Sequence, residues 1–330
     1  MKLYLAGGEQ QTDMFEAVAE ASGVKRFLKS FAYSSSRKTA DRLVDSDRPD
    51  LDILVDSGAY TAWKEGTPIV LSDYIRFSHS LKRKAKCTLN FIALDIIPGK
   101  ADRKQPTEQE FAEASQQGWD NYVAMKNAGI DCLPTFHQGD PWYWLEKMAH
   151  ETTYIALSPR KVGKTPKQKM LWLSECFRKI DKWGLLFKLK THGLGVASPV
   201  FMRAYPFYSV DTTSWFQAGR SSVYFSFNGM NVESLPPNEW GRNADRAYRN
   251  PRTGRAKMDN ISGVLCAIDR YQKPRGNHTR TLEAGYPWLM KRSMVVHAQL
   301  ENFITELWLG RGVNWDHDWS APIEPDYSRR

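Results

Sequence analysis

Residues 52–60 of the chain read DILVDSGAY, and this stretch decides the fold class. The apolar run Ile53–Val55 predicts a short buried strand that ends at Asp56, and Gly58 follows in a turn. Similar apolar runs recur along the chain and alternate with stretches that have the period of amphipathic helices. Such alternation predicts a parallel sheet that is covered by helices.

The alternation extends over most of the chain. The predicted strands are 2–6, 26–33, 52–56, 89–95, 131–136, 153–157, 186–191 and 206–211. The predicted helices are 11–22, 37–45, 72–86, 107–128, 141–150, 166–182 and 198–204, with Ser72, Thr107 and Ser198 as capping residues. We therefore predict an α/β fold, a (β/α)8 TIM barrel. A doubly wound open sheet is the main competitor, but neither GxGxxG nor GxxxxGK[ST] follows any predicted strand.

The chain has 330 residues, a length that a barrel can use as one unit. We expect a single domain over 1–330, with the barrel strands and motifs in 1–220 and a basic insertion with closing helices in 221–330. Within the latter part, 224–229 predicts an extra strand or hairpin, 234–260 an exposed loop, and 282–308 one or two helices. The tail 310–330 is expected to wrap the surface.

The distribution of charge indicates the kind of partner that the protein binds, and the cysteine content indicates its compartment. The formal net charge is +9, and residues 158–191 hold ten Lys or Arg against two acids, while 242–280 hold ten against three. Two such basic segments favour a polyanionic partner over solvated helix faces. Cysteines stand at 87, 132, 176 and 266 without a CxxC pair, which argues against a disulfide framework or a cysteine-rich zinc site. No apolar run is long enough for a membrane span, so we expect a cytoplasmic protein.

Polar groups follow six consecutive predicted strands, at the end where barrel enzymes carry their active sites. Asp56, Asp95 and Asp211 each end a strand, and His137 and His192 follow two others. Any one of these aspartates alone would more simply cap the next helix. Together they fit two chemistries, namely metal-assisted hydrolysis with the histidines as ligands, or displacement at the anomeric carbon of a sugar. The absence of an HxH pair disfavours the first.

Six motifs carry a family resemblance. They are DSGAY at 56–60, ALDIIPG at 93–99, HQGD at 137–140, YIALSP at 154–159, HGLG at 192–195 and YPFYSVDTTSW at 205–215. Their order and spacing resemble those of tRNA-guanine transglycosylases. They are more similar still to the DNA-modifying branch of that superfamily, the 7-deazaguanine DNA transglycosylases of phages and some bacterial genome islands. The resemblance covers about residues 50–220.

The resemblance implies a role for each motif. Asp211 would be the nucleophile that attacks the sugar and expels guanine, and Asp56 would be the general acid and base. Asp95 would read the ring N–H and exocyclic amine of the base. The remaining implied base-binding residues are Gln138, Gly139, Ser158, Tyr60 and His192, of which Tyr60 and His192 would sandwich the base. The implied reaction exchanges guanine in DNA, within the host cytoplasm if a phage encodes the protein, for a 7-deazaguanine such as 7-cyano-7-deazaguanine. It needs no cofactor and no metal.

The sequence also departs from the family pattern. Ser158-Pro159 stands where the tRNA enzymes carry Gly-Gly, and His192 stands where they carry methionine. Their zinc-binding cysteine cluster is missing, since Cys266 is the only cysteine after Cys176. This loss favours DNA as partner, held by a replacement phosphate-binding surface that we assign to Arg220, Arg249, Arg252, Arg255 and Lys257. Base exchange on tRNA, a metal-dependent barrel hydrolase and a non-catalytic nucleic-acid-binding barrel are the alternatives.

Overall fold

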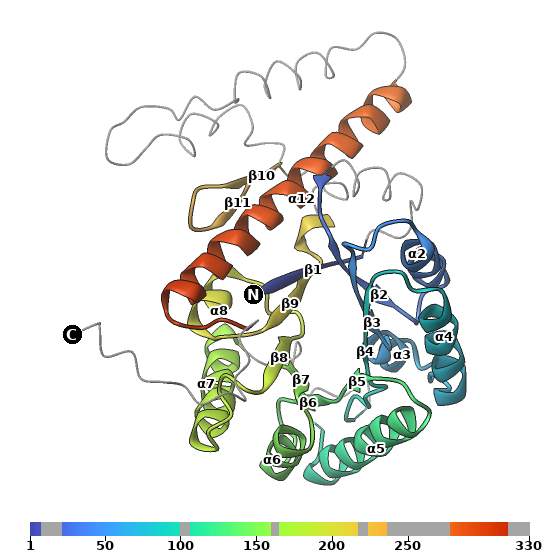
Figure 1. Ribbon diagram of the computed structural model, residues 1–330, viewed down its shortest axis with the longest axis vertical. Coiled ribbons are helices and arrows are strands. Elements are labelled where there is room, and N and C mark those ends of the chain that lie inside the picture. The colour runs from blue at the N-terminus through green and yellow to red at the C-terminus, as the bar shows by residue number, and fades with distance from the viewer. Residues whose placement is uncertain (8–21, 100–105, 160–164, 217–223, 236–277, 316–330) are drawn as a thin grey trace, which may run out of the picture. The chain divides into compact units, whose positions relative to one another are not determined.

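The computed structural model describes residues 1–7, 22–99, 106–159, 165–216, 224–235 and 278–315 (Figure 1). The chain divides into two compact units. The first comprises Met1–Gln10, Lys25–Thr212 and Glu301–Arg330, and the second comprises Gln11–Val24 and Thr213–Leu300. That residues 1–330 act as one domain stays a prediction.

A parallel sheet forms the centre of the first unit. Its strands are β1 (Lys2–Ala6), β2 (Arg26–Ser30), β3 (Asp52–Asp56), β4 (Thr88–Ile92), β5 (Cys132–Leu133), β6 (Thr135–His137), β7 (Tyr154–Ser158), β8 (Lys190–Gly193) and β9 (Ser209–Thr212). Within the described residues the strand order is β5-β4-β3-β2-β1-β9-β8-β7-β6, and each neighbouring pair is parallel. The first and last strands of this sheet in sequence order, β1 and β9, are therefore neighbours, as barrel closure requires.

Strands β5 and β6 are two pieces of one segment that is interrupted at Pro134. The first piece pairs with β4, and the second pairs with β7. Proline has no N–H to donate to a ladder, although the Pro134 carbonyl still accepts from the Ala156 N–H at 2.8 Å. Counted as one strand, the segment joins the two ends of the sheet. The predicted (β/α)8 barrel is thus confirmed.

All eight predicted strands are present, but several of their ends were predicted wrongly. The predicted 26–33 strand ends at Ser30, and the predicted 89–95 strand ends at Ile92, so Asp95 lies on the loop that follows. The predicted 186–191 strand begins only at Lys190, because Lys188 and Leu189 donate their backbone N–H groups to the Leu185 carbonyl and form a turn. Apolar composition alone does not distinguish such a turn from a strand.

Helices surround the ring of strands (Figure 1). They are α2 (Ser34–Asp45), α3 (Ala59–Glu65), α4 (Leu71–Lys84), α5 (Glu108–Asn127), α6 (Trp142–Glu151), α7 (Pro166–Lys182) and α8 (Pro199–Ala204). Apart from α3, each was predicted, whereas the predicted helix 11–22 lies almost entirely outside the described residues. Thr107 and Ser198 cap α5 and α8 as predicted. Ser72 does not cap α4, because the helix already begins at Leu71.

Alternate strand residues fill the barrel interior. The buried core cluster consists of Tyr4, Ala6, Leu28, Leu54, Ile92, Leu133 and Ala156. Since side chains alternate along a strand, the residues two positions before and after a core residue also point inward. In β3 these are Asp52 below Leu54 and Asp56 above it, so one strand brings a carboxylate to each end of the barrel.

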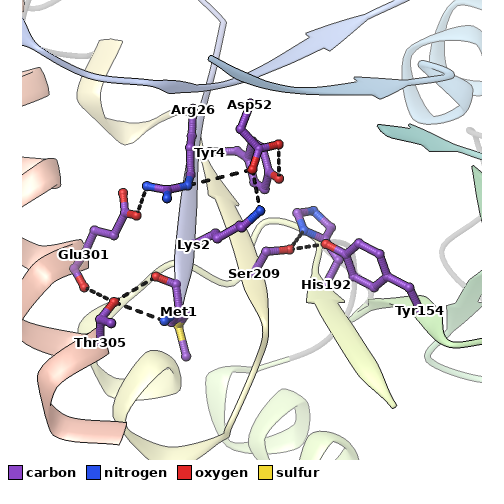
Figure 2. Close-up of polar contacts among 10 residues, drawn as sticks. All are labelled: Met1, Lys2, Tyr4, Arg26, Asp52, Tyr154, His192, Ser209, Glu301 and Thr305. Carbon is purple, nitrogen blue, oxygen red and sulfur yellow. Dashed lines mark hydrogen bonds and ion pairs between the residues drawn. The ribbon is translucent and has the colours of Figure 1, made fainter. Parts of the chain in front are cut away.

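Polar contacts close the end of the barrel where the strands begin (Figure 2). Asp52 accepts from Lys2 Nζ at 2.5 Å and from the Tyr4 hydroxyl at 2.8 Å. Arg26 pairs with Glu301, which belongs to the last turns of helix α12 (His278–Gly310). Next to it, Thr305 hydrogen-bonds the Met1 ammonium at 3.0 Å. The network ties the first three strands to the closing helix.

Little of the second unit is described. It contains a hairpin of β10 (Tyr224–Phe227) and β11 (Val232–Leu235), so the strand or hairpin predicted at 224–229 is present as the first strand of a hairpin that extends to Leu235. Helix α12 is one continuous helix where one or two were predicted. Most of the predicted loop 234–260, of the basic segment 242–280 and of the tail lies outside the described residues. No described helix is long and apolar enough to span a membrane.

Candidate active site

The polar residues predicted to form the site lie where the barrel strands end. Asp56 is the last residue of β3, and Ser158 is the last residue of β7. Asp95 follows β4 by three residues, and Asp211 is the third residue of β9. Because the strands are parallel, their carboxyl ends meet at one end of the barrel. The three predicted carboxylates therefore belong to the same mouth.

Only one of the two carboxylate oxygens of Asp211 is held by a hydrogen bond from the described residues. Its Oδ1 accepts from the Gly195 backbone N–H at 2.7 Å and lies 3.6 Å from His192 Nε2. Among the described residues, Oδ2 has no hydrogen-bond partner. The side chain is 11% exposed, so it is sheltered from bulk water yet reachable from the barrel mouth. A buried carboxylate with one fixed and one open oxygen has the form of an aligned nucleophile.

His192 lies below Asp211, inside the barrel. Its Nδ1 is 2.6 Å from Ser209 Oγ, and its ring meets the edge of the Tyr4 ring at a centroid distance of 6.0 Å. The residue is fully buried. It therefore presents no ring face to a ligand in this structure, and its contacts fit a polar role better than the base-sandwiching role that the resemblance implies. Tyr60, the other implied stacking residue, is 38% exposed on α3.

Asp95 belongs to a buried network that sequence reasoning missed. Its Oδ1 accepts from the Ser57 hydroxyl at 3.2 Å, and its Oδ2 accepts from His137 Nε2 at 2.8 Å. The other ring nitrogen of His137 lies 3.5 Å from Asp140 Oδ2, which also accepts the His137 backbone N–H at 2.8 Å. One imidazole thus stands between two carboxylates. The HQGD motif contains both His137 and Asp140, but its spacing does not show that they meet Asp95.

The two carboxylates determine the charge of His137. Burial alone would lower the pKa of the imidazole, but the hydrogen bonds with Asp140 and Asp95 outweigh it and raise the pKa from 6.5 to about 10. His137 is therefore an imidazolium at neutral pH. Its positive charge lies beside Asp95 at the barrel mouth.

A sharp turn positions Asp56. Its Oδ2 accepts from the Gly58 backbone N–H at 3.1 Å, and Gly58 has a φ of 82°. A Cβ at this position would lie 2.4 Å from the Ala32 Cβ, so both the conformation and the space require glycine. The next residues begin helix α3, which carries Tyr60.

A second glycine shapes the loop after β6. Gly139 has a φ of 119°, and a Cβ there would meet the Phe111 ring at 2.4 Å. A backbone hydrogen bond positions the preceding Gln138, because its N–H donates to the Ser158 carbonyl at 3.0 Å. Its side-chain Nε2 lies 3.4 Å from the Gln168 carbonyl of α7. The base-recognition role of Gln138, Gly139 and Ser158 stays a prediction.

Some predicted residues lie outside the described part of the chain. These are the proposed phosphate contacts Arg220, Arg249, Arg252, Arg255 and Lys257. Among the described residues, no three His, Cys, Asp or Glu side chains are grouped so that they could hold a metal ion. Both ring nitrogens of His137 already face carboxylates, so the geometry offers no support for the histidine metal site considered above.

Comparisons with known proteins identify no family. No family model matches the chain, and no curated protein matches it. Several solved structures show a weak likeness to the chain. One, from Aquifex aeolicus VF5, has a TM-score of 0.40 and 14% identity, and the match covers 67% of this chain and 86% of that chain. A 4-hydroxy-2-oxoglutarate aldolase from TTHB1 has a TM-score of 0.36 and 11% identity, covering 66% and 84%. A putative fructose-1,6-biphosphate aldolase from Coccidioides immitis has a TM-score of 0.32 and 10% identity, covering 93% of each chain. At these levels the likenesses carry no argument about chemistry.

Proposed function

We propose that the chain is a transglycosylase that exchanges guanine in DNA for a 7-deazaguanine base through a covalent aspartyl intermediate. The arrangement of Asp211 is the observation that carries this proposal. Its Oδ1 is anchored by the Gly195 N–H, and its Oδ2 is open at the barrel mouth. Double displacement at an anomeric carbon requires such a carboxylate, ionised and fixed in direction.

The two displacement steps use two aspartates: Asp211 forms and breaks the bond to the sugar, and Asp56 gives up and takes back the proton. Asp211 Oδ2 forms a bond to C1′ of the deoxyribose while the bond from C1′ to guanine N9 breaks, and the departing base takes a proton from Asp56. The incoming base then attacks C1′ through N9 and returns its N9 proton to Asp56. The bond to Asp211 breaks, and the new base occupies the face of the sugar that guanine left.

Asp95 supports recognition of the base. Each of its oxygens accepts one protein hydrogen bond and retains capacity for another, so both can accept from the ring N–H and the exocyclic amine of a guanine-like edge. His137 donates to one of these oxygens and so fixes the direction of the carboxylate. A 7-deazaguanine presents the same edge as guanine, because only the N7 position differs. One pocket therefore accepts both the leaving and the incoming base.

The choice of DNA rests on the resemblance and on the charge pattern. The basic segments 158–191 and 242–280 supply phosphate-binding groups, and the family zinc cluster is missing from the sequence. The guanine must leave the base stack to reach the mouth, so the substrate is either a single strand or a duplex from which the base is flipped.

The decisive experiment follows labelled guanine and the protein–DNA adduct. The wild-type protein should incorporate labelled guanine into DNA and give a denaturation-resistant adduct when the incoming base is withheld. Asp211→Asn should give neither, while it folds and binds DNA normally. Asp50→Asn, at an exposed surface pair, is the matched control and should behave as wild type. Full base exchange by Asp211→Asn would refute the assignment of Asp211 as the nucleophile. Base exchange on tRNA but not on DNA would show that tRNA, and not DNA, is the substrate.

A further inference from the structure

A chain of polar groups leads from the barrel interior to Asp211, and Figure 2 shows three of its members, Tyr154, Ser209 and His192. The Tyr154 hydroxyl lies 2.5 Å from Ser209 Oγ, and Ser209 Oγ lies 2.6 Å from His192 Nδ1. The other ring nitrogen, His192 Nε2, is buried without a hydrogen-bond partner and lies 3.6 Å from Asp211 Oδ1. Four residues from three neighbouring strands, β7, β8 and β9, therefore form one line that ends at the proposed nucleophile.

The protons available on Tyr154, Ser209 and His192 determine which group donates each hydrogen bond. Burial raises the pKa of Tyr154, so its hydroxyl keeps its proton. If Tyr154 donates to Ser209, then Ser209 donates to His192 Nδ1, and both hydroxyl protons are bonded. If the line ran the other way, the Tyr154 proton would be buried without an acceptor, a costly arrangement. The favourable direction makes His192 Nδ1 an acceptor.

An acceptor at Nδ1 places the proton of a neutral imidazole on Nε2. That N–H then faces Asp211 Oδ1. The opposite tautomer would direct an Nε2 lone pair at a carboxylate oxygen, which is repulsive. Ser209 and Asp211 lie two residues apart on β9, so they share the inward face and hold the imidazole between them.

We infer that Tyr154 and Ser209 hold His192 in the tautomer protonated at Nε2, so that its Nε2–H faces Asp211 Oδ1 at 3.6 Å and His192 is a positioning residue for the covalent step. This inference rests on the proposed function for its kinetic part, but its structural part does not depend on it. The Gly195 N–H is then bonded to Oδ1, and the N–H of His192 faces the same oxygen. Consequently Oδ2 is the oxygen that attacks.

The N–H of His192 has opposite effects on the two displacement steps. Asp211 bears a full charge before attack, and its charge is lost when Oδ2 becomes bonded to C1′. The charge returns when the bond from C1′ to Oδ2 breaks and the electron pair goes back to the carboxylate. A donor at Oδ1 stabilises the charged form more than the ester. His192 therefore favours release of the intermediate, while its own proton stays on Nε2 throughout.

The structural part is tested by nitrogen NMR of protein labelled at its seven histidines, with His192 assigned through His192→Gln. The wild type should show a protonated Nε2 and an unprotonated Nδ1 at this residue. Ser209→Ala should weaken or reverse that preference, and Ser209→Thr, which keeps the hydroxyl, should restore it. Thr191→Val is the matched control, because Thr191 is a buried hydroxyl residue next to His192 on β8 whose side chain faces away from the barrel axis. A wild-type His192 protonated at Nδ1, alone or at both nitrogens, overturns the inference.

The kinetic part is tested by the amount of protein–DNA adduct when the incoming base is limiting. Ser209→Ala should accumulate adduct and release it about tenfold more slowly than wild type. Ser209→Thr and Thr191→Val should release it at the wild-type rate. A merely structural role predicts instead that Ser209→Ala lowers the adduct, and that result overturns the positioning role. If the wild type itself forms no adduct, the proposed function fails, while the NMR result still decides the tautomer.

Discussion

The charge of His137 at neutral pH differs between the unfolded chain and the barrel. In the unfolded chain its imidazole titrates near pH 6.5, and in the barrel its two carboxylate partners raise the pKa to about 10. A group whose pKa is raised on folding contributes stability that is fully present below its unfolded pKa. That contribution is lost as the pH rises from 6.5 towards 10 and beyond.

Replacing His137 should therefore have a pH-dependent cost. We expect His137→Gln to lower the free energy of unfolding at pH 6 to 7 by on the order of 3 kcal/mol, since the charged partner of Asp95 and Asp140 is removed. The difference from wild type should shrink at pH 10 and above. Urea unfolding at several pH values measures it. His150→Gln, on the exposed face of α6, is the control and should show no comparable pH-dependent loss. A constant difference from pH 6 to 10.5 would show that His137 is not charged by folding.

The sequence predicts the site residues better than it predicts their partners. Asp56, Asp95 and Asp211 are recognisable because each directly follows an apolar run. Their hydrogen bonds are not, since Ser57 reaches Asp95 across 38 positions and His137 reaches it across 42. Such contacts depend on where neighbouring strands end. A shift of one residue in register would turn these side chains to the other face of the sheet.

At the scale of elements, helix starts are set by local chemistry. Helix α5 has a capping box, in which Thr107 Oγ1 accepts from the Glu110 N–H at 3.2 Å and the Thr107 N–H donates to Glu110 Oε2 at 2.8 Å. Helix α4 starts at Leu71 without a side-chain cap, although Ser72 resembles one in the sequence. A hydroxyl caps a helix only from the residue before the first turn.

Thr107 and Ser72 give a paired prediction. We expect Thr107→Ala to lower the free energy of unfolding by about 1 kcal/mol, because it leaves an N–H of the first turn of α5 without its acceptor. Ser72→Ala should change it by no more than about 0.5 kcal/mol, since Ser72 is exposed within the first turn of α4. Denaturant unfolding compares both with wild type. Equal costs would mean that the capping box contributes nothing.

Element boundaries were predictable where they depend on composition and wrong where they depend on hydrogen bonding. The helix 166–182 was predicted to the residue, with Pro166 at its first position after the capping Thr165. The strand predicted at 186–191 was not, because a turn centred on the Leu185 carbonyl uses the same apolar residues. Short α3 escaped prediction, since a seven-residue helix is too short to show a clear period.

At the scale of the whole molecule, the two ends of the barrel have different tasks. Asp52 and Asp56 both point inward from β3, one at each end. Asp52 binds Lys2 and Tyr4 where the strands begin, whereas Asp56 lies at the mouth. In barrels the chemistry is at the carboxyl ends of strands and the opposite end provides stability. The sequence singles out Asp56 as a site residue, whereas the contacts of Asp52 with Lys2 and Tyr4 are known only from the structure.

This division predicts that stability and activity can be separated. Asp52→Ala should lower the free energy of unfolding by roughly 2–4 kcal/mol, because it leaves Lys2 and the buried Tyr4 hydroxyl without their acceptor. Adduct formation by the folded variant should stay at the wild-type level. Asp50→Ala, at an exposed pair with Arg48, should cost less than about 1 kcal/mol. Loss of adduct in a folded Asp52→Ala protein would show that the two ends are coupled.

Under the proposed function, the break at Pro134 has a consequence for how base specificity would evolve. Where β5 gives way to β6, the backbone ladder to β4 ends, and the Asp95–His137 side-chain pair joins the two sides of the mouth. A ladder resists change, because every slip misaligns a whole strand. A joint made of side chains can be altered by single substitutions while the barrel remains closed elsewhere. If the chain exchanges bases as proposed, relatives with another base preference should differ from it first at positions 95 and 137, along this seam.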